Sequence, residues 1–339
     1  MPIQTEHPNR TRSNAKGRFA ALLLFAGVIT GCATPPPYQP MSPQEVDAFV
    51  ADLQANQPDL RQRVMVAAHR QLGQPYDIYL LGEFPFEIDD PQPLYQLEKS
   101  DCVVFVEHTY AMALSRNWAE FFGYLQRIRY IDGRIGVATR NHYTEPQWNP
   151  NNHWLVEDVT ADVAGETAVT FVAKANVAKF LRNRFDKQLD EWIIEQETAY
   201  LSHEHFGLVH AAVAAGQLRD GDLVQIVRGT PPTPKQTTGE DGRYAGAYVG
   251  HFGLLEVDDA GTPWFVHSGS PEVRRERLRD YGDRATARNA QRAAEGRPQF
   301  LGFKFLALQD DPATNLRAID GEHAPVVTYA PNLPLPRER

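Results

Sequence analysis

Apolar residues at helical spacing predict two helices before residue 73. The first begins at Ser42, where the run Ser-Pro-Gln-Glu offers an N-cap hydroxyl, a proline at the first helical position and a glutamate three residues on. The second is predicted over residues 59–72 and ends at Gly73. Its apolar face is formed by Val64, Ala67, Ala68 and Leu72. Neither helix carries an obvious chemical group.

Alternation of apolar and polar residues predicts antiparallel strands later in the chain. A turn at residues 258–261, Asp-Asp-Ala-Gly, joins two of these strands in a hairpin. A helix predicted over residues 202–215 leads into the first strand. The predicted strands lie near residues 222–227, 248–257, 263–268 and 300–308. The pattern therefore predicts an α+β fold with helices packed on an antiparallel sheet.

The first residues have the pattern of an export signal. An apolar stretch, residues 19–29, is too short to span a bilayer comfortably. Four basic residues precede it: Arg10, Arg12, Lys16 and Arg18. The following Thr-Gly-Cys32 resembles the lipobox of bacterial lipoproteins, which implies that Cys32 is acylated and becomes the mature N-terminus. The residue after the cysteine is Ala33 rather than an aspartate, which resembles lipoproteins that are sorted to the outer membrane. The alternative is an N-terminal transmembrane anchor.

The local composition divides the chain into four predicted segments. Residues 1–31 are the predicted signal peptide, and the proline-rich residues 32–41 are a predicted tether. We expect residues 42–310 to form a single catalytic domain and residues 311–339 to form a C-terminal tail. Residues 229–244 include a run rich in threonine and proline and are expected to form a surface loop.

The net charge of the chain limits the kinds of molecule that it can bind. Without residues 1–31 the chain has 308 residues and a formal charge of −12, compared with −9 for the whole sequence. This acidic balance argues against a nucleic-acid partner. No second long apolar segment follows the signal, so we expect a water-soluble monomer that lipid alone holds to the membrane.

Acylation of Cys32 would leave one thiol, Cys102, in the mature protein. Ser100 or Asp101 can cap a helix that starts at this residue. The buried stripe of that helix is predicted to be Val103, Val106, Tyr110 and Ala113. The helix dipole at this position is expected to lower the thiol pKa and favour a nucleophilic thiolate. The alternative is a small, buried, unreactive side chain.

Two histidines occur at matched positions of the predicted hairpin. His251 and His267 are symmetric about residue 259, so we expect them to face each other directly on neighbouring strands. One imidazole could then orient the other, as a cysteine hydrolase requires. A lone histidine in a strand is most often a structural residue, so the pair rather than either histidine alone indicates catalysis.

Five short motifs occur in the order found in NlpC/P60 cysteine peptidases of bacterial cell walls, and the resemblance covers roughly residues 60–308. They are Gly73-Gln74-Pro75-Tyr76, Asp101-Cys102, Gly221-Asp222-Leu223-Val224, His251-Phe252-Gly253-Leu254 and His267-Ser268-Gly269-Ser270. The chain resembles the N-acetylmuramoyl-L-alanine amidase-like branch (DUF1460) more closely. The distinctive residues are Asp101-Cys102-x-x-Phe105-Val106-Glu107 and the block Arg140-Asn141-His142-Tyr143 with Trp148, Asn152 and Asp158-Val159-Thr160.

The resemblance implies a papain-like NlpC/P60 fold, with the nucleophile at a helix N-terminus, the histidines on an antiparallel sheet, and the N-terminal helices as additions. We expect Cys102 to attack an amide carbonyl, His251 to transfer the proton and His267 to orient His251. The Cys102 N–H is the expected oxyanion donor. No metal or cofactor is implied.

Several residues are candidates for substrate contact. Tyr76 and Tyr248 match cleft positions of the family. Asp101 could bind a cationic group of the substrate, or it could merely cap the helix. The block Arg140, Asn141, His142 and Tyr143 suits a groove for a polar muropeptide, although a loop pinned by hydrogen bonds is an equal alternative.

The expected function is cleavage of the MurNAc–L-Ala amide of peptidoglycan, by a lipoprotein on the periplasmic side of the outer membrane. One alternative is cleavage of the D-Glu–diamino acid bond of the stem peptide, and another is a non-catalytic wall-binding lipoprotein. A zinc hydrolase would have to use His203, His205 and His210 with Glu204, but these residues do not form a His-Glu-x-x-His motif.

Overall fold

The structure of the chain is a computed structural model that describes residues 38–238, 243–321 and 328–329. These residues belong to one compact unit, Pro37–Arg339. The predicted signal peptide and Cys32 lie outside the described residues and stay predictions. Among the helices that the structure describes, none is both long enough and apolar enough to cross a bilayer.

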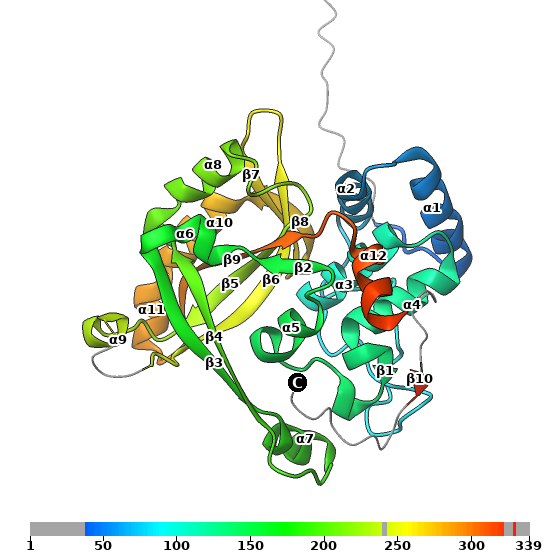
Figure 1. The fold of residues 1–339 in the computed structure, drawn as a ribbon, viewed down its shortest axis with the longest axis horizontal. Helices are drawn as coiled ribbons and strands as arrows, with labels where there is room; N and C mark the ends of the chain where they lie inside the picture. The colour runs from blue at the N-terminus through cyan, green and yellow to red at the C-terminus, as the bar shows by residue number, and fades with distance from the viewer. Residues whose placement is uncertain (1–37, 239–242, 322–327, 330–339) are drawn as a thin grey trace, which may run out of the picture. The chain divides into compact units, whose positions relative to one another are not determined.

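An eight-stranded sheet lies at the centre of this unit (Figure 1). Its neighbours follow the order β3-β4-β9-β5-β6-β7-β8, β2 also pairs with β9, and every pairing is antiparallel. The strands are β2 (Val156–Asp158), β3 (Ala168–Asn176), β4 (Ile193–Ser202), β5 (Leu223–Gly229), β6 (Ala247–Val257), β7 (Pro263–Gly269), β8 (Glu272–Arg277) and β9 (Gln299–Leu308). The sequence predicted β5, β6, β7 and β9 close to these bounds, but not β2, β3, β4 or β8.

Helices cover both faces of the sheet. One core is built from the sheet and α1 (Pro43–Asn56), α2 (Leu60–Arg70), α3 (Cys102–Leu114), α4 (Trp118–Arg129) and α12 (Pro312–Asp320). The other is built from the sheet and α6 (Thr160–Ala164), α8 (Gly207–Ala214) and α10 (Leu278–Ala287). Neighbouring residues of a strand alternate between the cores, since Leu254 enters the first and Leu255 the second. The predicted α+β class with an antiparallel sheet is confirmed.

Shorter elements complete the chain. The helices are α5 (Asn149–Asn151), α7 (Val177–Phe185), α9 (Pro234–Thr238) and α11 (Asn289–Ala294). Single turns are η1 (Ile131–Gly133), η2 (Val137–Thr139), η3 (Thr144–Trp148), η4 (Gly165–Thr167) and η5 (His203–His205), and a small parallel pair joins β1 (Arg134–Ile135) to β10 (Thr328–Tyr329). Of the predicted surface loop 229–244, the structure assigns the first residue to β5 and residues 234–238 to α9.

The N-terminal helices follow the sequence signals closely. Ser42 caps α1 in a capping box with Glu45, and Pro43 is its first residue. After α2 the chain reaches Gly73 with φ of +79°, a left-handed conformation that glycine adopts without strain. The helix predicted over residues 202–215 is divided into η5 and α8.

The ordered unit extends beyond both predicted boundaries. Before residue 42, the Tyr38 hydroxyl donates to Leu97 O at 2.7 Å and Met41 is buried. After residue 310, α12 contributes Leu316 to the first core, and Asp320 pairs with Arg127 at 2.8 Å. The last residues of the predicted tether and the first part of the predicted tail therefore belong to the domain, because they bury apolar side chains against it.

Asp222 joins three elements of the first core. Its Oδ1 accepts hydrogen bonds from Arg61 on α2 at 2.6 Å and from the Leu308 N–H of β9 at 2.9 Å, while Oδ2 accepts from the Arg219 N–H at 2.7 Å. The preceding residue, Gly221, accepts a hydrogen bond from the Tyr110 hydroxyl of α3 through its carbonyl. The Gly-Asp motif at the start of β5 thus fixes α2 and α3 against the sheet.

We predict that Asp222→Ala lowers the free energy of unfolding by about 3 kcal/mol, because the buried Arg61 guanidinium and two N–H groups lose their acceptor. Denaturant unfolding measures the change. Asp310→Ala is the matched control, since this exposed aspartate also pairs with an arginine, Arg219, and should cost less than about 0.5 kcal/mol. Equal stabilities for the two variants would contradict the assignment.

Candidate functional site

Cys102 is the first residue of α3, as predicted. The helix is capped by Asp101, whose Oδ1 accepts hydrogen bonds from the N–H groups of Val103 at 2.9 Å and Val104 at 2.8 Å. The predicted stripe residues Val106, Tyr110 and Ala113 are fully buried, while Val103 is only half-buried. Cys102 is a free cysteine, and the residue as a whole is half-buried.

Two serines fasten the start of α3 to β7. Ser100 donates its hydroxyl proton to Ser268 Oγ at 3.0 Å, and Ser268 donates to the Ser100 carbonyl at 2.8 Å. Both side chains are fully buried. Because Ser268 directly follows His267, this pair fixes Cys102 relative to the histidine-bearing strands.

The surroundings of the Cys102 sulfur favour the thiol, not the thiolate that we expected from the sequence. Burial raises the pKa of the Cys102 thiol to about 12, and the neighbouring Asp101 carboxylate raises it further. The N–H groups of Phe252, Cys102 and Val103 lower this pKa but do not compensate. At neutral pH the cysteine is therefore a thiol, and the prediction of a lowered pKa was wrong because burial outweighs the helix terminus.

The two histidines form a hydrogen-bonded pair, although not in the predicted register. His251 Nε2 lies 2.8 Å from His267 Nδ1. The strands pair as Leu254 with Val266, which places Gly253 rather than His251 opposite His267. The connection between the strands has five residues, 258–262, so the hairpin is centred on residue 260 rather than 259. The prediction that the two histidines face each other directly was therefore wrong. A side chain at position 253 would collide with the Cβ of His267, and glycine leaves the room that the diagonal contact needs.

A carboxylate that the sequence did not predict completes the group. Glu276 on β8 lies with Oε1 2.9 Å from His267 Nε2 and 3.3 Å from Arg274 Nε, and its Oε2 pairs with Arg284 of α10. Burial would raise the pKa of this carboxyl, but the hydrogen bonds from His267 and Arg284 and the Arg284 charge outweigh burial and lower the pKa to about 2. Glu276 is therefore an anion at neutral pH.

The direction of the hydrogen bonds follows from this charge. The Glu276 carboxylate can only accept, so His267 carries a proton on Nε2. Burial lowers the pKa of His267, so its ring is neutral and Nδ1 accepts. His251 then donates from Nε2 to His267, which leaves its Nδ1 with a free lone pair. Burial, followed by the neighbouring His267, lowers the pKa of His251 well below its usual value, so its ring is neutral. The arrangement creates a base at His251 Nδ1.

Tyr281 packs beside both histidines. Its ring stacks on His251 with centroids 6.2 Å apart, and its hydroxyl accepts a hydrogen bond from Arg228 at 3.2 Å. Burial raises the pKa of Tyr281, with a smaller contribution from Cys102. The Phe252 N–H, one residue after His251, also faces the sulfur. No hydrogen bond joins Cys102 directly to His251 among the described atoms.

The other predicted tyrosines lie at different places. Tyr76 pairs with Ser100 in an isolated bridge, and its pKa is raised by burial and then by Cys102, so it lies beside the nucleophile. Tyr248 is 45% exposed on β6, three residues before His251. Asp101 caps the helix and also lines a pocket, so its capping role is confirmed and contact with substrate stays a prediction.

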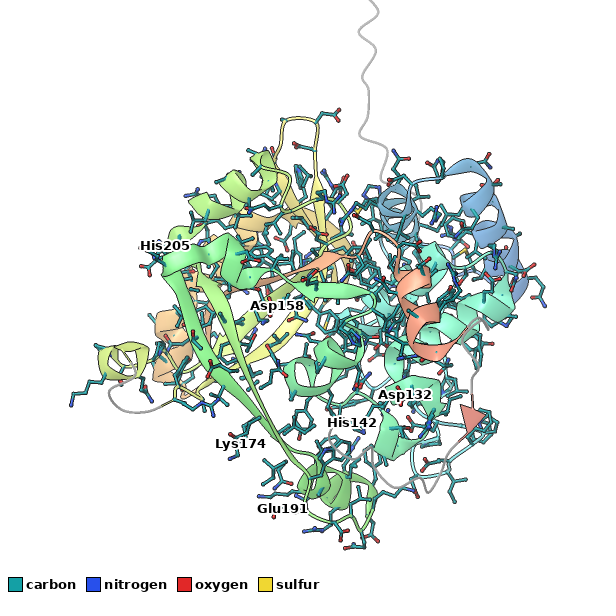
Figure 2. All side chains as sticks on the ribbon, in the orientation of Figure 1. Asp132, His142, Asp158, Lys174, Glu191 and His205 are labelled. Atoms are coloured by element: carbon teal, nitrogen blue, oxygen red, sulfur yellow. The ribbon has the colours of Figure 1, made fainter. Side chains whose placement is uncertain are left out.

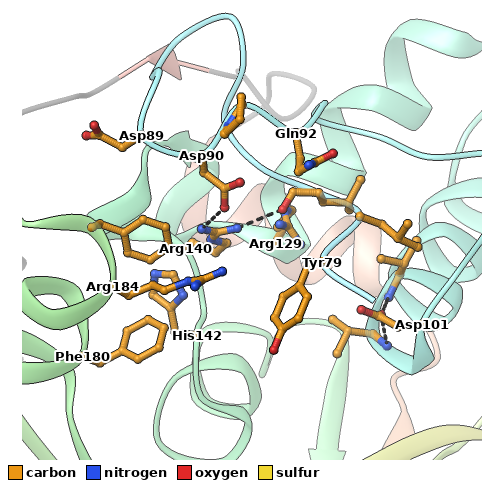
Figure 3. A pocket seen from close by; sticks show the side chains of 16 residues that line it. Tyr79, Asp89, Asp90, Gln92, Asp101, Arg129, Arg140, His142, Phe180 and Arg184 are labelled. Carbon is orange, nitrogen blue, oxygen red and sulfur yellow. Dashed lines mark hydrogen bonds and ion pairs between the residues drawn. The ribbon is translucent and has the colours of Figure 1, made fainter. Parts of the chain in front are cut away.

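The block from Arg140 to Tyr143 divides between a pocket and a pinned loop. Arg140 and His142 line a pocket of about 730 Å³, which also contains Asp101, Val103 and Val104 from the start of α3 (Figure 3). His142, labelled in Figure 2, has its Nε2 2.7 Å from the Val137 carbonyl. Its ring packs on Phe180 of α7 (Figure 3).

Asn141 and Tyr143 do not line this pocket. Asn141 donates to the Ile128 carbonyl at 3.1 Å and accepts from Asn151 at 2.7 Å, while Tyr143 packs edge-on against Phe180. These two side chains hold the loop in place, as the alternative interpretation expected for the block.

The histidines considered as zinc ligands do not form one site. His203 pairs with Asp283 at 2.7 Å, His205 is nearest to the exposed Glu204, and His210 packs against Phe206. Within residues 38–238 and 243–321, no three side chains of histidine, cysteine, aspartate or glutamate lie close enough together to hold a metal ion.

Comparison with known proteins identifies relatives of the chain. A family model described as N-acetylmuramoyl-L-alanine amidase-like (AmiA-like) matches residues 67–281, which include Cys102, both histidines and Glu276. The fold is similar to the crystal structure of protein LPG0564 from Legionella pneumophila str. Philadelphia 1, assigned to the DUF1460 family model. The match has a TM-score of 0.58 and 19% identity, and covers 78% of this chain and 95% of that chain. No curated protein matches the sequence.

The raised pKa of Cys102 predicts how the thiol reacts. Because only the thiolate is alkylated, the rate of modification by iodoacetamide should rise about tenfold per pH unit from pH 6 to pH 9, without a plateau. Intact-protein mass spectrometry measures the rate, and Cys102→Ala reports labelling at Cys32. A rate that is constant between pH 5 and pH 8 would instead indicate a preformed thiolate and contradict the buried thiol.

Proposed function

Because the chain belongs to the N-acetylmuramoyl-L-alanine amidase-like family, we propose that it hydrolyses the amide between N-acetylmuramic acid and L-alanine in peptidoglycan, with Cys102 as the nucleophile. The observation that carries this proposal is the hydrogen-bonded series His251–His267–Glu276 beside a thiol at a helix N-terminus. A thiol, a neutral base and a group that orients the base are the parts that nucleophilic amide hydrolysis requires.

The reaction begins from a neutral pair. The Cys102 sulfur attacks the lactyl carbonyl as its proton passes to His251 Nδ1, which gives a tetrahedral intermediate. His251 then donates this proton to the alanine nitrogen, the carbon–nitrogen bond breaks, and the peptide leaves as an amine. A water attacks the remaining thioester with His251 again as base, which releases the sugar carboxylate and restores the thiol. Catalytic cysteine–histidine contacts are often loose without substrate and tighten when it binds.

The partly buried anion Glu276 supports the proton transfer. When His251 becomes an imidazolium, its hydrogen bond to His267 and the negative charge of Glu276 beyond it stabilise the positive charge. Since Glu276 has a pKa of about 2, its negative charge is present throughout the useful pH range. This charge favours the protonated form of His251 during turnover, although burial keeps the ring neutral beforehand.

The oxyanion has a donor at the start of α3. The Cys102 N–H is in the first turn, where backbone amides have no intrahelical acceptor, and it already faces the sulfur. We assign it to the developing oxyanion, and Tyr76, beside Cys102, to the wall of the same cleft.

The finer placement of the protein is also part of the proposal. The five ordered motifs support a papain-like fold of the NlpC/P60 superfamily. The lipobox-like sequence at Cys32 supports export, acylation and a periplasmic position on the outer membrane. The family description favours the muramoyl amide over the D-Glu–diamino acid bond.

Product identification tests the scissile bond. After incubation with MurNAc-tripeptide, mass spectrometry should detect the intact tripeptide and free N-acetylmuramic acid. Release of MurNAc-L-Ala-D-Glu would instead assign the endopeptidase. Cys102→Ala should abolish product formation, and activity should survive EDTA. Hydrolysis by Cys102→Ala at the wild-type rate would contradict the cysteine nucleophile, and loss of activity in EDTA would favour a metal enzyme.

The role of Glu276 gives a separate prediction. Glu276→Gln should lower kcat by about 100-fold with little change in KM, because an amide can donate to His267 and reverse the hydrogen bonds that prepare His251. Glu272→Gln on the same strand is the control, since this side chain is exposed. A merely structural role for Glu276 would be revealed by a fall in the unfolding midpoint with kcat preserved in the folded fraction.

A further inference from the structure

The pocket beside α3 contains a buried guanidinium whose hydrogen-bonding capacity is not met by its neighbours. Arg129, the last residue of α4, lines the pocket and is 7% exposed. Its Nε is buried and has no hydrogen-bond partner among the described residues. The nearest carboxylate oxygen, Glu107 Oε2, lies 3.6 Å from Nη1, beyond hydrogen-bond distance. Glu107 instead accepts a hydrogen bond from Trp148 at 3.0 Å through its other oxygen.

Such a group is costly to bury without a partner. A buried charge is normally retained only where it is both paired and hydrogen-bonded. Burial also raises the pKa of Glu107 to about 7, so this neighbour is only partly ionised at neutral pH. Glu107 and Glu83 stabilise the Arg129 charge, but the buried Nε of Arg129 still lacks an acceptor, in a pocket that is open to a ligand.

The remaining charges of the pocket are largely used within the protein. Arg140 pairs with Asp90 at 2.8 Å and donates to the Leu81 carbonyl at 3.1 Å (Figure 3). Asp89 pairs with Lys187 at 2.6 Å. The exposed Arg184 lies over the Tyr79 ring, 5.6 Å from its centroid. After these pairings, the charges left at the pocket are two arginines, Arg129 and Arg184, and one carboxylate, Asp101.

The pocket begins next to the nucleophile. Asp101, Val103 and Val104 all line it, and they flank Cys102 in the chain. Burial raises the pKa of Asp101, and the Arg129 charge offsets part of this rise; both side chains line the pocket. Asp101 Oδ1 is already shared by two N–H groups of α3, which reduces its repulsion of an anion. A ligand that leads from Cys102 into the pocket thus meets a net positive wall.

The chemistry of the two halves of the substrate decides which half fits. This step rests on the proposed function. The N-acetylated sugar is uncharged once its lactyl group is in the amide. The peptide carries its first carboxylate on D-glutamate, two residues beyond the scissile carbonyl, or roughly 7 Å along an extended chain. A planar carboxylate matches the fork of a guanidinium, which can bind it through two hydrogen bonds.

We propose that this pocket is the stem-peptide subsite and that Arg129 binds the α-carboxylate of D-glutamate. The pocket volume of about 730 Å³ lies in the range of ordinary ligand sites. Arg184 at the pocket rim adds positive charge that favours the same anion. The enzyme would then select peptides whose D-glutamate is not amidated.

The test compares two substrates that differ at one group. MurNAc-L-Ala-γ-D-Glu-diamino acid is assayed beside the same compound with the D-glutamate α-carboxylate converted to an amide. Wild type should show about 10- to 100-fold lower kcat/KM for the amide, as loss of a charge-assisted hydrogen bond requires. Arg129→Gln should bring the two values to within about twofold of each other by slowing hydrolysis of the acid substrate.

A matched variant distinguishes loss of the subsite from a general loss of folding. Arg127→Gln removes another buried arginine of α4, which pairs with Asp320 outside the pocket, and it should keep the wild-type preference. Arg129→Lys keeps the charge and should keep part of the preference. Equal kcat/KM values in wild type, or an unchanged preference in folded Arg129→Gln, would overturn the proposal.

Binding distinguishes this inference from the proposed function. Calorimetric titration of Cys102→Ala with the free tripeptide, and with its amidated form, needs no hydrolysis. Tighter binding of the acid form, lost in Cys102→Ala/Arg129→Gln, supports the subsite even if no amide is cleaved by wild type. Equal binding of both peptides overturns the subsite even if the muramoyl amide is hydrolysed.

Discussion

The buried hydrogen bonds between Ser100 and Ser268 are the contact on which the geometry of the site depends. They join the residue two places before Cys102 to the residue directly after His267. These two positions are 168 residues apart in the chain, so neither element can place the other by local structure. Helix α3 supplies the thiol, the hairpin supplies the base, and the serine pair fixes one against the other.

Burial then determines how these groups react. The same low-polarity surroundings that raise the pKa of Cys102 lower that of His251, so the free protein holds a thiol beside a neutral imidazole. Only Glu276 keeps its charge, because His267 and two arginines stabilise the carboxylate. The hydrogen bonds from this anion orient the lone pair of His251, and the thiol is ionised only as it attacks.

Much of this arrangement could be predicted from local signals. The capped start of α3, the capping box of α1 and the strands that carry the histidines follow from side-chain spacing and turn residues, which act over a few positions. The thiol pKa could not be predicted, because it depends on burial by residues distant in the chain. The register of the histidines depended on a five-residue turn and on the space left by Gly253.

Glu276 escaped prediction for a related reason. Strand β8 consists mostly of charged residues, with the sequence Glu-Val-Arg-Arg-Glu-Arg, so it lacks the apolar alternation that indicates a strand. Without that strand there was no register to place Glu276 near His267. The sequence did not predict a role for the buried Arg129 either. Basic residues at the end of a helix such as α4 are common. Only the packing shows which of them faces a pocket.

The amidase-like family supports a cell-wall substrate for this chemistry. The central claim is that amide cleavage proceeds through a thioester on Cys102. The most direct measurement is acid quenching during turnover of MurNAc-tripeptide, followed by digestion at low pH and mass spectrometry of the peptide that contains Cys102. We expect an N-acetylmuramoyl group on the Cys102 sulfur, which disappears when substrate is exhausted. Turnover with Cys102 unmodified at every time point, or with the group on another residue, would contradict it.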